Sequence, residues 1–194
     1  MQVGSKKLFD VLLEFNRYLA SELGAIAVGG TALTLLGKKE STKDIDLCFE
    51  DEQGKKRFIR TAERLGYTHE SDRLIGHGII IDVYSNGFIF CVQLPPDYRG
   101  KTVQIRNMGK LSISALSPED LIITKTARLN ERDTEDIEGI FKDFVIDREG
   151  LVSRYMSVME NSVVRDAKSN LVWLAERFGF PGALREKISR WGYG

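Results

Sequence analysis

The chain has 194 residues, of which 42% are hydrophobic, enough for one domain or for a core with a small second unit. Its 28 basic and 28 acidic side chains cancel, which excludes a global basic field for long nucleic acid and leaves only local contacts for such a partner. The two cysteines, Cys48 and Cys91, lie in apolar contexts typical of buried thiols in a reducing compartment. No signal peptide or membrane-length apolar run is evident, so we expect a cytoplasmic protein with no membrane contact.

The first elements are a helix, a short strand and a glycine turn. Apolar residues at helical spacing predict an amphipathic helix over residues 5–23 that covers a sheet. Residues 25–28 form a short apolar run, typical of a buried strand. Gly29 and Gly30 then allow a sharp turn, and residues 31–36 predict a short helix that stops at Gly37.

The glycine turn is a candidate anion site. The free N–H groups and the positive dipole end of the following helix suit a triphosphate, and Thr31 adds a hydroxyl donor. The spacing fits neither the dinucleotide fingerprint nor a Walker A loop. A simple tight turn is the alternative interpretation.

Three aspartates give the sequence its strongest chemical signal. Asp44 and Asp46 alternate with apolar residues, so on a strand both carboxylates point to one face. Asp82 interrupts the apolar strand predicted over residues 78–84, and an acidic residue there needs a partner or a purpose. If the two strands pair, three carboxylates converge on one divalent-metal site. An edge strand with a solvated face is the alternative for Asp44 and Asp46.

The middle of the chain predicts a strand-rich, mixed sheet. A charged amphipathic helix is expected over residues 53–65, and Asn86-Gly87 is a strong hairpin signal between the Asp82 strand and a strand over residues 88–94. Two further strands are expected at residues 101–106 and 111–115.

The last part of the chain predicts helices. Ser117-Pro118 is typical of a helix start, and Lys125 and Arg128 share a face of the helix that follows. A charge cluster of Arg132, Asp133, Glu135 and Asp136 comes next. Amphipathic helices follow from about residue 148, and their scattered basic residues suit either a solvated surface or contacts with RNA.

Together, the Gly-Gly turn, the short helix, the Asp-x-Asp pair and the later Asp82 strand resemble the nucleotidyltransferase superfamily with a DNA polymerase beta-like fold. The stretch VGGTAL…ST-K-DIDL is most similar to AbiEii-type and minimal nucleotidyltransferases of bacteria and archaea. The motifs cover residues 25–84, with a weaker match to about 140. One departure is Glu40, which stands where many relatives carry an arginine, and this puts a phosphate contact from that position in doubt.

The resemblance implies an α+β fold in which a mixed β-sheet core is flanked by helices. Residues 1–116 would form the catalytic core and residues 117–194 a C-terminal helical region. The implied activity is transfer of an NMP from an NTP to a hydroxyl acceptor with one or two Mg²⁺ ions.

The resemblance also implies roles for particular residues. Asp44, Asp46 and Asp82 would be catalytic and metal-binding, and Gly29, Gly30 and Thr31 would hold the β- and γ-phosphates. By position, Lys125 matches a lysine that reaches the triphosphate, and Arg132-Asp133 with Asp136 matches a segment that orders the site. Surface salt bridges are the alternative for these charges.

Two other functions remain open. One is a catalytically silent nucleotide-binding module that acts through a protein partner, although three intact aspartates argue against it. The other is a toxin-type transferase directed at tRNA, with an antitoxin-type partner. The acceptor (RNA, protein or small molecule), the nucleotide and the oligomeric state are not evident from the sequence.

Overall fold

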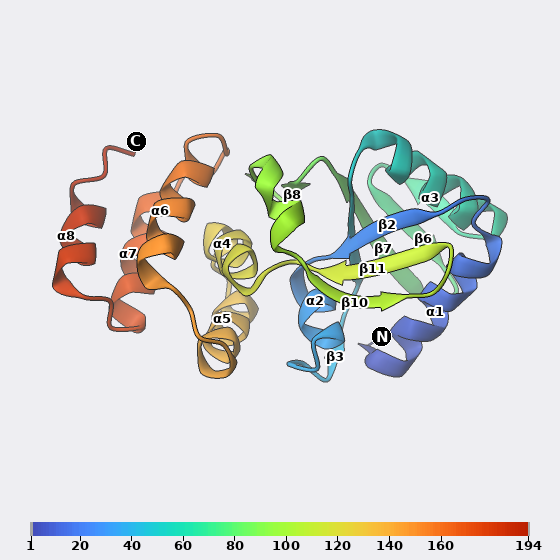
Figure 1. Cartoon of the computed structure of the whole chain (residues 1–194), viewed down its shortest axis with the longest axis horizontal. Coiled ribbons are helices and arrows are strands. Elements are labelled where there is room, and N and C mark those ends of the chain that lie inside the picture. Colours follow the sequence, from blue (N-terminus) through green and yellow to red (C-terminus); the bar gives the residue numbers. More distant parts are fainter. Residues whose placement is uncertain (1, 194) are drawn as a thin grey trace. The chain divides into compact units, whose positions relative to one another are not determined.

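A mixed β-sheet organises the first part of the chain in the computed structural model, which describes residues 2–193 (Figure 1). Its strand order is β10 (Val103–Asn107), β11 (Leu111–Ala115), β2 (Leu23–Ala27), β4 (Ile45–Phe49), β7 (Ile79–Ser85), β6 (Arg73–Gly76) and β5 (Thr68–Glu70). The β11–β2 and β4–β7 pairs are parallel and the other neighbours antiparallel. The expected mixed sheet is therefore confirmed, with β4 in its interior.

The chain divides into two compact units. Unit 1 comprises the residues up to Gly87 together with Pro96–Ser117, and unit 2 comprises Phe88–Pro95 and the residues from Pro118 onward. The main boundary lies between Ser117 and Pro118, and the segment Phe88–Pro95 belongs to unit 2. The expected division after residue 116 into a catalytic core and a C-terminal helical region stays a prediction.

The other elements of unit 1 surround the sheet. They are the helices α1 (Ser5–Tyr18), α2 (Gly29–Leu35) and α3 (Glu52–Arg64), the 3-10 helix η1 (Pro96–Lys101), and a small antiparallel pair of β1 (Val3–Gly4) and β3 (Ser41–Thr42). The helix α1 is shorter than predicted, because the backbone becomes extended at Leu19. Asp51 caps α3 by accepting a hydrogen bond from the Gly54 amide at 2.7 Å.

The core of unit 1 lies between the sheet and the helices α1 and α3 (Figure 1). Phe15 of α1 stacks on Phe58 of α3 at 4.2 Å between ring centroids, and Phe49 of β4 contacts Phe58 at 4.9 Å. Because side chains alternate along a strand, Ile45 and Leu47 share this apolar face with Phe49. Asp46 and Cys48 therefore face the other way, where the Tyr98 hydroxyl of η1 lies 3.9 Å from the Cys48 sulfur.

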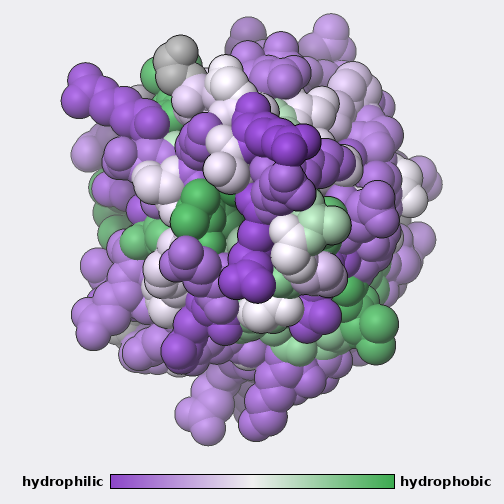
Figure 2. Space-filling model, turned by 90° about the vertical axis from the view of Figure 1, so that its left-hand side faces the viewer, coloured by the Kyte–Doolittle hydropathy of each residue, from purple (hydrophilic) through white to green (hydrophobic). Residues whose placement is uncertain are grey.

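Unit 2 is mainly helical. It contains α4 (Pro118–Arg128), α5 (Glu131–Asp143), α6 (Arg148–Met159), α7 (Ala167–Arg177) and α8 (Gly182–Ser189), with the antiparallel strands β8 (Phe88–Ile89) and β9 (Val92–Gln93). The face on the side of α8 is mostly hydrophilic, with small separate apolar patches (Figure 2). None of the helices within residues 2–193 is long and apolar enough to cross a membrane.

The strand predicted over residues 88–94 is wrong in one respect, because the chain reverses in its middle. Asn86 and Gly87 both have positive φ, as a tight hairpin turn requires. Phe90 is also left-handed, at φ 57°, and separates β8 from β9. The Arg128 guanidinium lies 3.6 Å from the centre of the Phe90 ring, a contact that local sequence does not reveal.

Candidate active site

A row of charged side chains crosses three adjacent strands of unit 1. Asp46 of β4 is the direct register partner of Asp82 on β7, and Asp82 is the direct partner of Arg73 on β6. Neighbouring strands lie about 4.8 Å apart, and register partners point to the same face of a sheet. We call Asp46, Asp82 and Arg73 the charged row. It lies on the sheet face opposite α1 and α3.

The two aspartates of the charged row are buried. Burial raises the pKa of Asp82 above its ordinary value. The Arg73 guanidinium lowers this pKa, while the negative charges of Asp44 and Asp72 raise it further. Arg73 donates from Nε to Asp82 Oδ1 at 2.8 Å. The Asp82 carboxylate thus lies in a setting that disfavours its charge, and the Arg73 guanidinium partly compensates for this.

Asp44 does not lie on the strand, which differs from the sequence prediction. The strand β4 begins at Ile45, and Asp44 occupies a half-buried bend just before it. Its carbonyl oxygen accepts hydrogen bonds from the hydroxyls of Thr31 (3.2 Å) and Thr42 (2.9 Å). Asp44 is close enough to raise the pKa of Asp82, so the structure brings all three predicted aspartates into one region. The edge-strand alternative is wrong, because β4 lies between β2 and β7 and is buried throughout.

Thr31 holds this aspartate segment in place. Its side chain is fully buried, and its hydroxyl donates to the Asp44 carbonyl while accepting from the Asp46 amide at 2.9 Å. The hydrogen of this hydroxyl thus points to the Asp44 carbonyl, and Thr31 joins α2 to the start of β4. A contact of Thr31 with a phosphate stays a prediction.

The two glycines are required for different reasons. Gly29, the first residue of α2, has φ of 54°, a left-handed conformation that favours glycine. A Cβ at Gly30 would lie 2.7 Å from Thr42 Oγ1, so a side chain there would displace the threonine that supports Asp44. The backbone at Gly30 thus approaches another part of the protein closely, where the sequence predicted an approach to a ligand.

Lys125 belongs to a buried ion cluster in unit 2. Its side chain is 2% exposed, and its ammonium donates to Asp133 at 3.1 Å and to Asp136 at 2.6 Å. Arg128 donates to the same Asp133 oxygen at 2.8 Å. The other Asp133 oxygen, Oδ2, is buried and has no hydrogen-bond partner within residues 2–193. The alternative of weak surface salt bridges is wrong, because these groups are mostly shielded from water. A contact of Lys125 with a triphosphate stays a prediction.

Sequence reasoning did not single out three polar residues that the structure makes prominent. Arg73, which received no role from the sequence, lies opposite Asp82 across a hairpin. Asp120 is fully buried and pairs with Arg154 through two hydrogen bonds of 2.6 and 2.9 Å. Counting the hairpin register back from Asp82 could have predicted its pairing with Arg73. No local sequence pattern indicates the Asp120–Arg154 pair.

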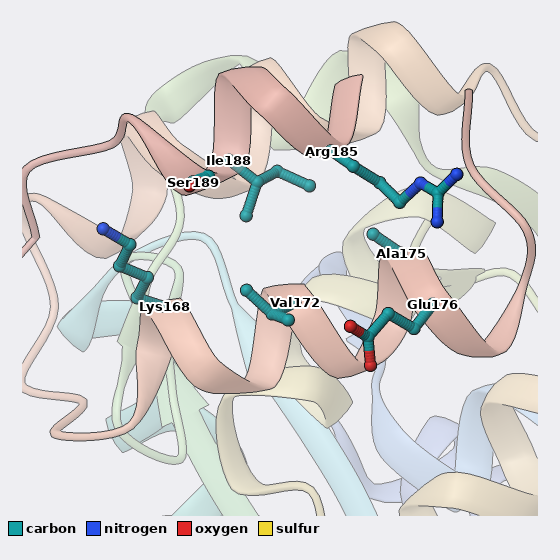
Figure 3. A pocket seen from close by; sticks show the side chains of 7 residues that line it. All are labelled: Lys168, Val172, Ala175, Glu176, Arg185, Ile188 and Ser189. Carbon is teal, nitrogen blue, oxygen red and sulfur yellow. The ribbon is translucent and has the colours of Figure 1, made fainter. Parts of the chain in front are cut away.

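A recess of about 370 Å³ lies between α7 and α8 in unit 2 (Figure 3). Val172, Ala175 and Ile188 give it an apolar floor. Arg185 and Glu176 lie toward one end and Lys168 toward the other (Figure 3). The Lys168 ammonium donates to the Trp191 carbonyl at 2.6 Å. The charged groups of the recess do not converge on one point, so the recess lacks the arrangement that catalysis requires.

The fold is that of a nucleotidyltransferase-like protein. The chain belongs to a family of nucleotidyltransferases of unknown function (DUF6036), whose model matches residues 6–178. The predicted superfamily is thus confirmed. The closer likeness to AbiEii-type proteins is not confirmed. No curated protein matches the chain significantly.

Two solved structures share the fold. An antigenic nucleotidyltransferase-like protein from Paracoccidioides brasiliensis is 15% identical, with a TM-score of 0.58 over 96% of this chain and 95% of that chain. The lincosamide antibiotic adenylyltransferase LnuA, solved with lincomycin bound, is 21% identical, with a TM-score of 0.54 over 75% of this chain and 100% of that chain. At these identities the likeness demonstrates the fold alone.

Proposed function

We propose that unit 1 catalyses metal-dependent transfer of a nucleoside monophosphate from an NTP to a hydroxyl acceptor. The observation that carries this proposal is the register of Asp46 and Asp82, two buried carboxylates side by side on interior strands. Asp44 lies close enough to add its charge. Folding alone gives no reason to gather three carboxylates there, whereas binding of a cation does.

The donor atoms suit Mg²⁺. Asp44, Asp46 and Asp82 offer only carboxylate oxygens, which hard divalent ions prefer over nitrogen or sulfur. Within residues 2–193 no three acidic, histidine or cysteine side chains are already arranged to hold a metal ion, so the three carboxylates would adjust when an ion binds. When bound, one or two Mg²⁺ ions would neutralise the triphosphate and lower the pKa of the acceptor hydroxyl.

The chemistry is a substitution at the α-phosphorus of the NTP. The acceptor oxygen forms a bond to that phosphorus, the bond to the oxygen bridging to the β-phosphate breaks, and pyrophosphate leaves. Asp82 would share the ion or take the acceptor proton. The amides that follow the glycine turn at Gly29 and Gly30 would hold the β- and γ-phosphates, since no side chain caps α2 by a hydrogen bond.

Positioning would supply most of the rate enhancement. Thr31 and Thr42 hold the backbone of the Asp44 segment through hydrogen bonds, so the chain that carries Asp44 and Asp46 would be in place before substrate arrives. A contact of Lys125 with the triphosphate would require its ammonium to leave two carboxylates in a buried setting first.

The experiment measures transfer of label from each α-phosphate-labelled NTP with Mg²⁺. The acceptors are total RNA, purified tRNA, the protein itself and lincomycin, the last because LnuA shares the fold. We expect Asp46→Asn to lower the transfer rate at least about a hundredfold without loss of fold. The matched control is Asp97→Asn, which removes an exposed carboxylate of η1 that pairs with Lys101.

The acceptor that becomes labelled identifies the substrate class. Label on tRNA would favour the toxin-type reading, and an antitoxin-type partner would then be sought. Binding of Mg²⁺ and NTP without transfer to any acceptor would favour the silent nucleotide-binding module. Equal transfer by wild type and Asp46→Asn would show that the site assignment is wrong.

A further inference from the structure

Arg73 is the member of the charged row that the proposed function leaves without a role. It is the direct cross-strand partner of Asp82, and its Nε donates to Asp82 Oδ1 at 2.8 Å. The bond uses one carboxylate oxygen, so the other oxygen, Oδ2, is the one left for a further ligand.

The Arg73–Asp82 pair is asymmetric. The Asp82 side chain is 13% exposed, whereas the Arg73 side chain is 59% exposed. Asp82 is therefore the group whose orientation the protein must control, since a buried carboxylate needs a donor. Arg73 reaches in from the outer side of the row, away from Asp46, because β6 lies on the far side of β7 from β4.

The backbone that carries Arg73 is held from two directions. The Asp72 carbonyl accepts a hydrogen bond from the Val83 amide at 2.9 Å, which ties the residue before Arg73 to the residue after Asp82. The Asp72 carboxylate also pairs with Lys55 of α3 at 2.5 Å. Arg73 is thus fixed at its base while its guanidinium contacts Asp82.

We propose that Arg73 is a positioning residue of the metal site, which holds Asp82 through Oδ1 and leaves Oδ2 for a divalent cation held together with Asp46. This inference rests on the proposed function, because it assumes that Asp46 and Asp82 bind the ion. It goes further by assigning a role to a residue outside the aspartate motif. Hydrogen-bond partners of metal ligands commonly change metal affinity 10–100-fold when removed.

Charge alone predicts the opposite result. A guanidinium beside a cation site repels the cation, so its removal would tighten binding of a divalent ion. Positioning predicts weaker binding, because the freed carboxylate loses its fixed orientation. The sign of the change in affinity therefore separates the two roles.

The experiment titrates Mn²⁺ into the full-length protein without nucleotide and measures bound ion by electron paramagnetic resonance. Arg73→Met keeps the aliphatic stem but removes the donor and the charge, and we expect about tenfold weaker binding. Arg73→Lys restores the charge and a donor and should recover part of the loss. Lys43→Met, which removes a positive charge next to Asp44 in the chain, is the charge control and should leave binding unchanged or tighter.

Two further measurements make the test specific. Thermal unfolding of each variant checks the fold. Arg73→Met leaves the Asp82 carboxylate without its donor, so some loss of stability is expected there, whereas Arg73→Lys keeps a cation and should melt closer to wild type. In transfer assays at saturating Mg²⁺, Arg73→Met should lower kcat while the KM for the NTP stays within about twofold, because positioning acts on the reacting centre.

Asp46→Asn distinguishes failure of this inference from failure of the proposed function. If Asp46→Asn weakens Mn²⁺ binding but Arg73→Met binds as tightly as wild type or tighter, only the positioning role is overturned. If Asp46→Asn binds Mn²⁺ like wild type, the proposed metal site is wrong and the role of Arg73 falls with it.

Discussion

The molecule contains two groups of charges that differ in balance. In unit 1, the carboxylates of Asp44, Asp46 and Asp82 lie in one region with a single guanidinium, that of Arg73, which contacts Asp82. In unit 2, the buried ion cluster sets Lys125 and Arg128 against Asp133 and Asp136, two cations against two carboxylates. A buried cluster with equal numbers of cations and carboxylates is typical of a structural role. An excess of carboxylates instead favours binding of a cation from outside the chain. On this ground we propose a chemical role for the first group and a structural role for the second.

Removing the lysine of the balanced cluster should have the largest effect on stability. Lys125→Met leaves two carboxylates without their shared cation, and breaking a buried pair in this way costs about 3–5 kcal/mol. We expect the melting temperature to fall by about 6–20 °C, measured by calorimetry or circular dichroism.

The matched control for Lys125 is Lys101→Met. It breaks an exposed pair with Asp97 and should change the free energy of unfolding by less than about 1 kcal/mol. If Lys125→Met were as stable as this control but inactive, the cluster would serve catalysis, and the contrast between the two groups of charges would be wrong.

A methyl group at Gly30 should disturb the unbalanced group through its support. The new Cβ of Gly30→Ala would lie 2.7 Å from Thr42 Oγ1, and such crowding costs about 1–3 kcal/mol. Because Thr42 holds the Asp44 carbonyl, transfer activity should fall together with stability.

A double-mutant cycle tests the origin of the Gly30 effect. In a Thr42→Ala background the nearest remaining Thr42 atom would be Cβ at 3.4 Å, so Gly30→Ala should cost clearly less there. Equal costs of Gly30→Ala in both backgrounds, measured by urea unfolding, would mean that Thr42 is not the cause.

The burial of the Asp82 carboxylate should make the free energy of unfolding depend on pH. Because burial raises the pKa of Asp82 in the folded state, protonation of Asp82 favours the folded chain. This stability is present in full below the ordinary pKa of an aspartate and is lost as the pH rises through the raised value. In metal-free buffer, Asp82→Asn should therefore unfold with a higher free energy than wild type at neutral pH.

The gain from Asp82→Asn should shrink as the pH is lowered, because the wild-type carboxyl becomes neutral as well. Asp97→Asn, at an exposed position, should give no such pH-dependent difference. A gain that grew in acid would contradict the direction of the pKa shift and would place Asp82 in a setting that favours its charge.

The sequence predicted the parts of the site that depend on local pattern. Alternation around Asp46 predicted the face of its side chain. The interruption at Asp82 marked a second acidic strand, and the structure pairs this strand, β7, with β4. The family match confirms the superfamily that these motifs resembled. Arg73 was missed because its position opposite Asp82 depends on hairpin register, which a one-residue slip would reverse.

Other features depend on contacts between segments distant in the chain. The burial of Lys125 follows from the packing of α5 against α4, and helical periodicity alone does not distinguish a buried lysine from an exposed one. The reversal at Phe90 accompanies a contact with Arg128 on another element. From the sequence, a phosphate was the expected partner of the Thr31 hydroxyl. In the structure this hydroxyl bonds to the Asp44 carbonyl and the Asp46 amide.

The smallest effect is expected at the recess between α7 and α8, which holds neither an excess of charge nor a balanced cluster. Glu176→Gln changes one exposed side chain on its rim and should alter the free energy of unfolding by less than about 0.5 kcal/mol. Transfer measured with every acceptor should also stay unchanged, since the charged groups of the recess do not converge. A selective loss of transfer to one acceptor would instead show that the recess binds that acceptor. The recess would then be a functional region in addition to the two groups of charges.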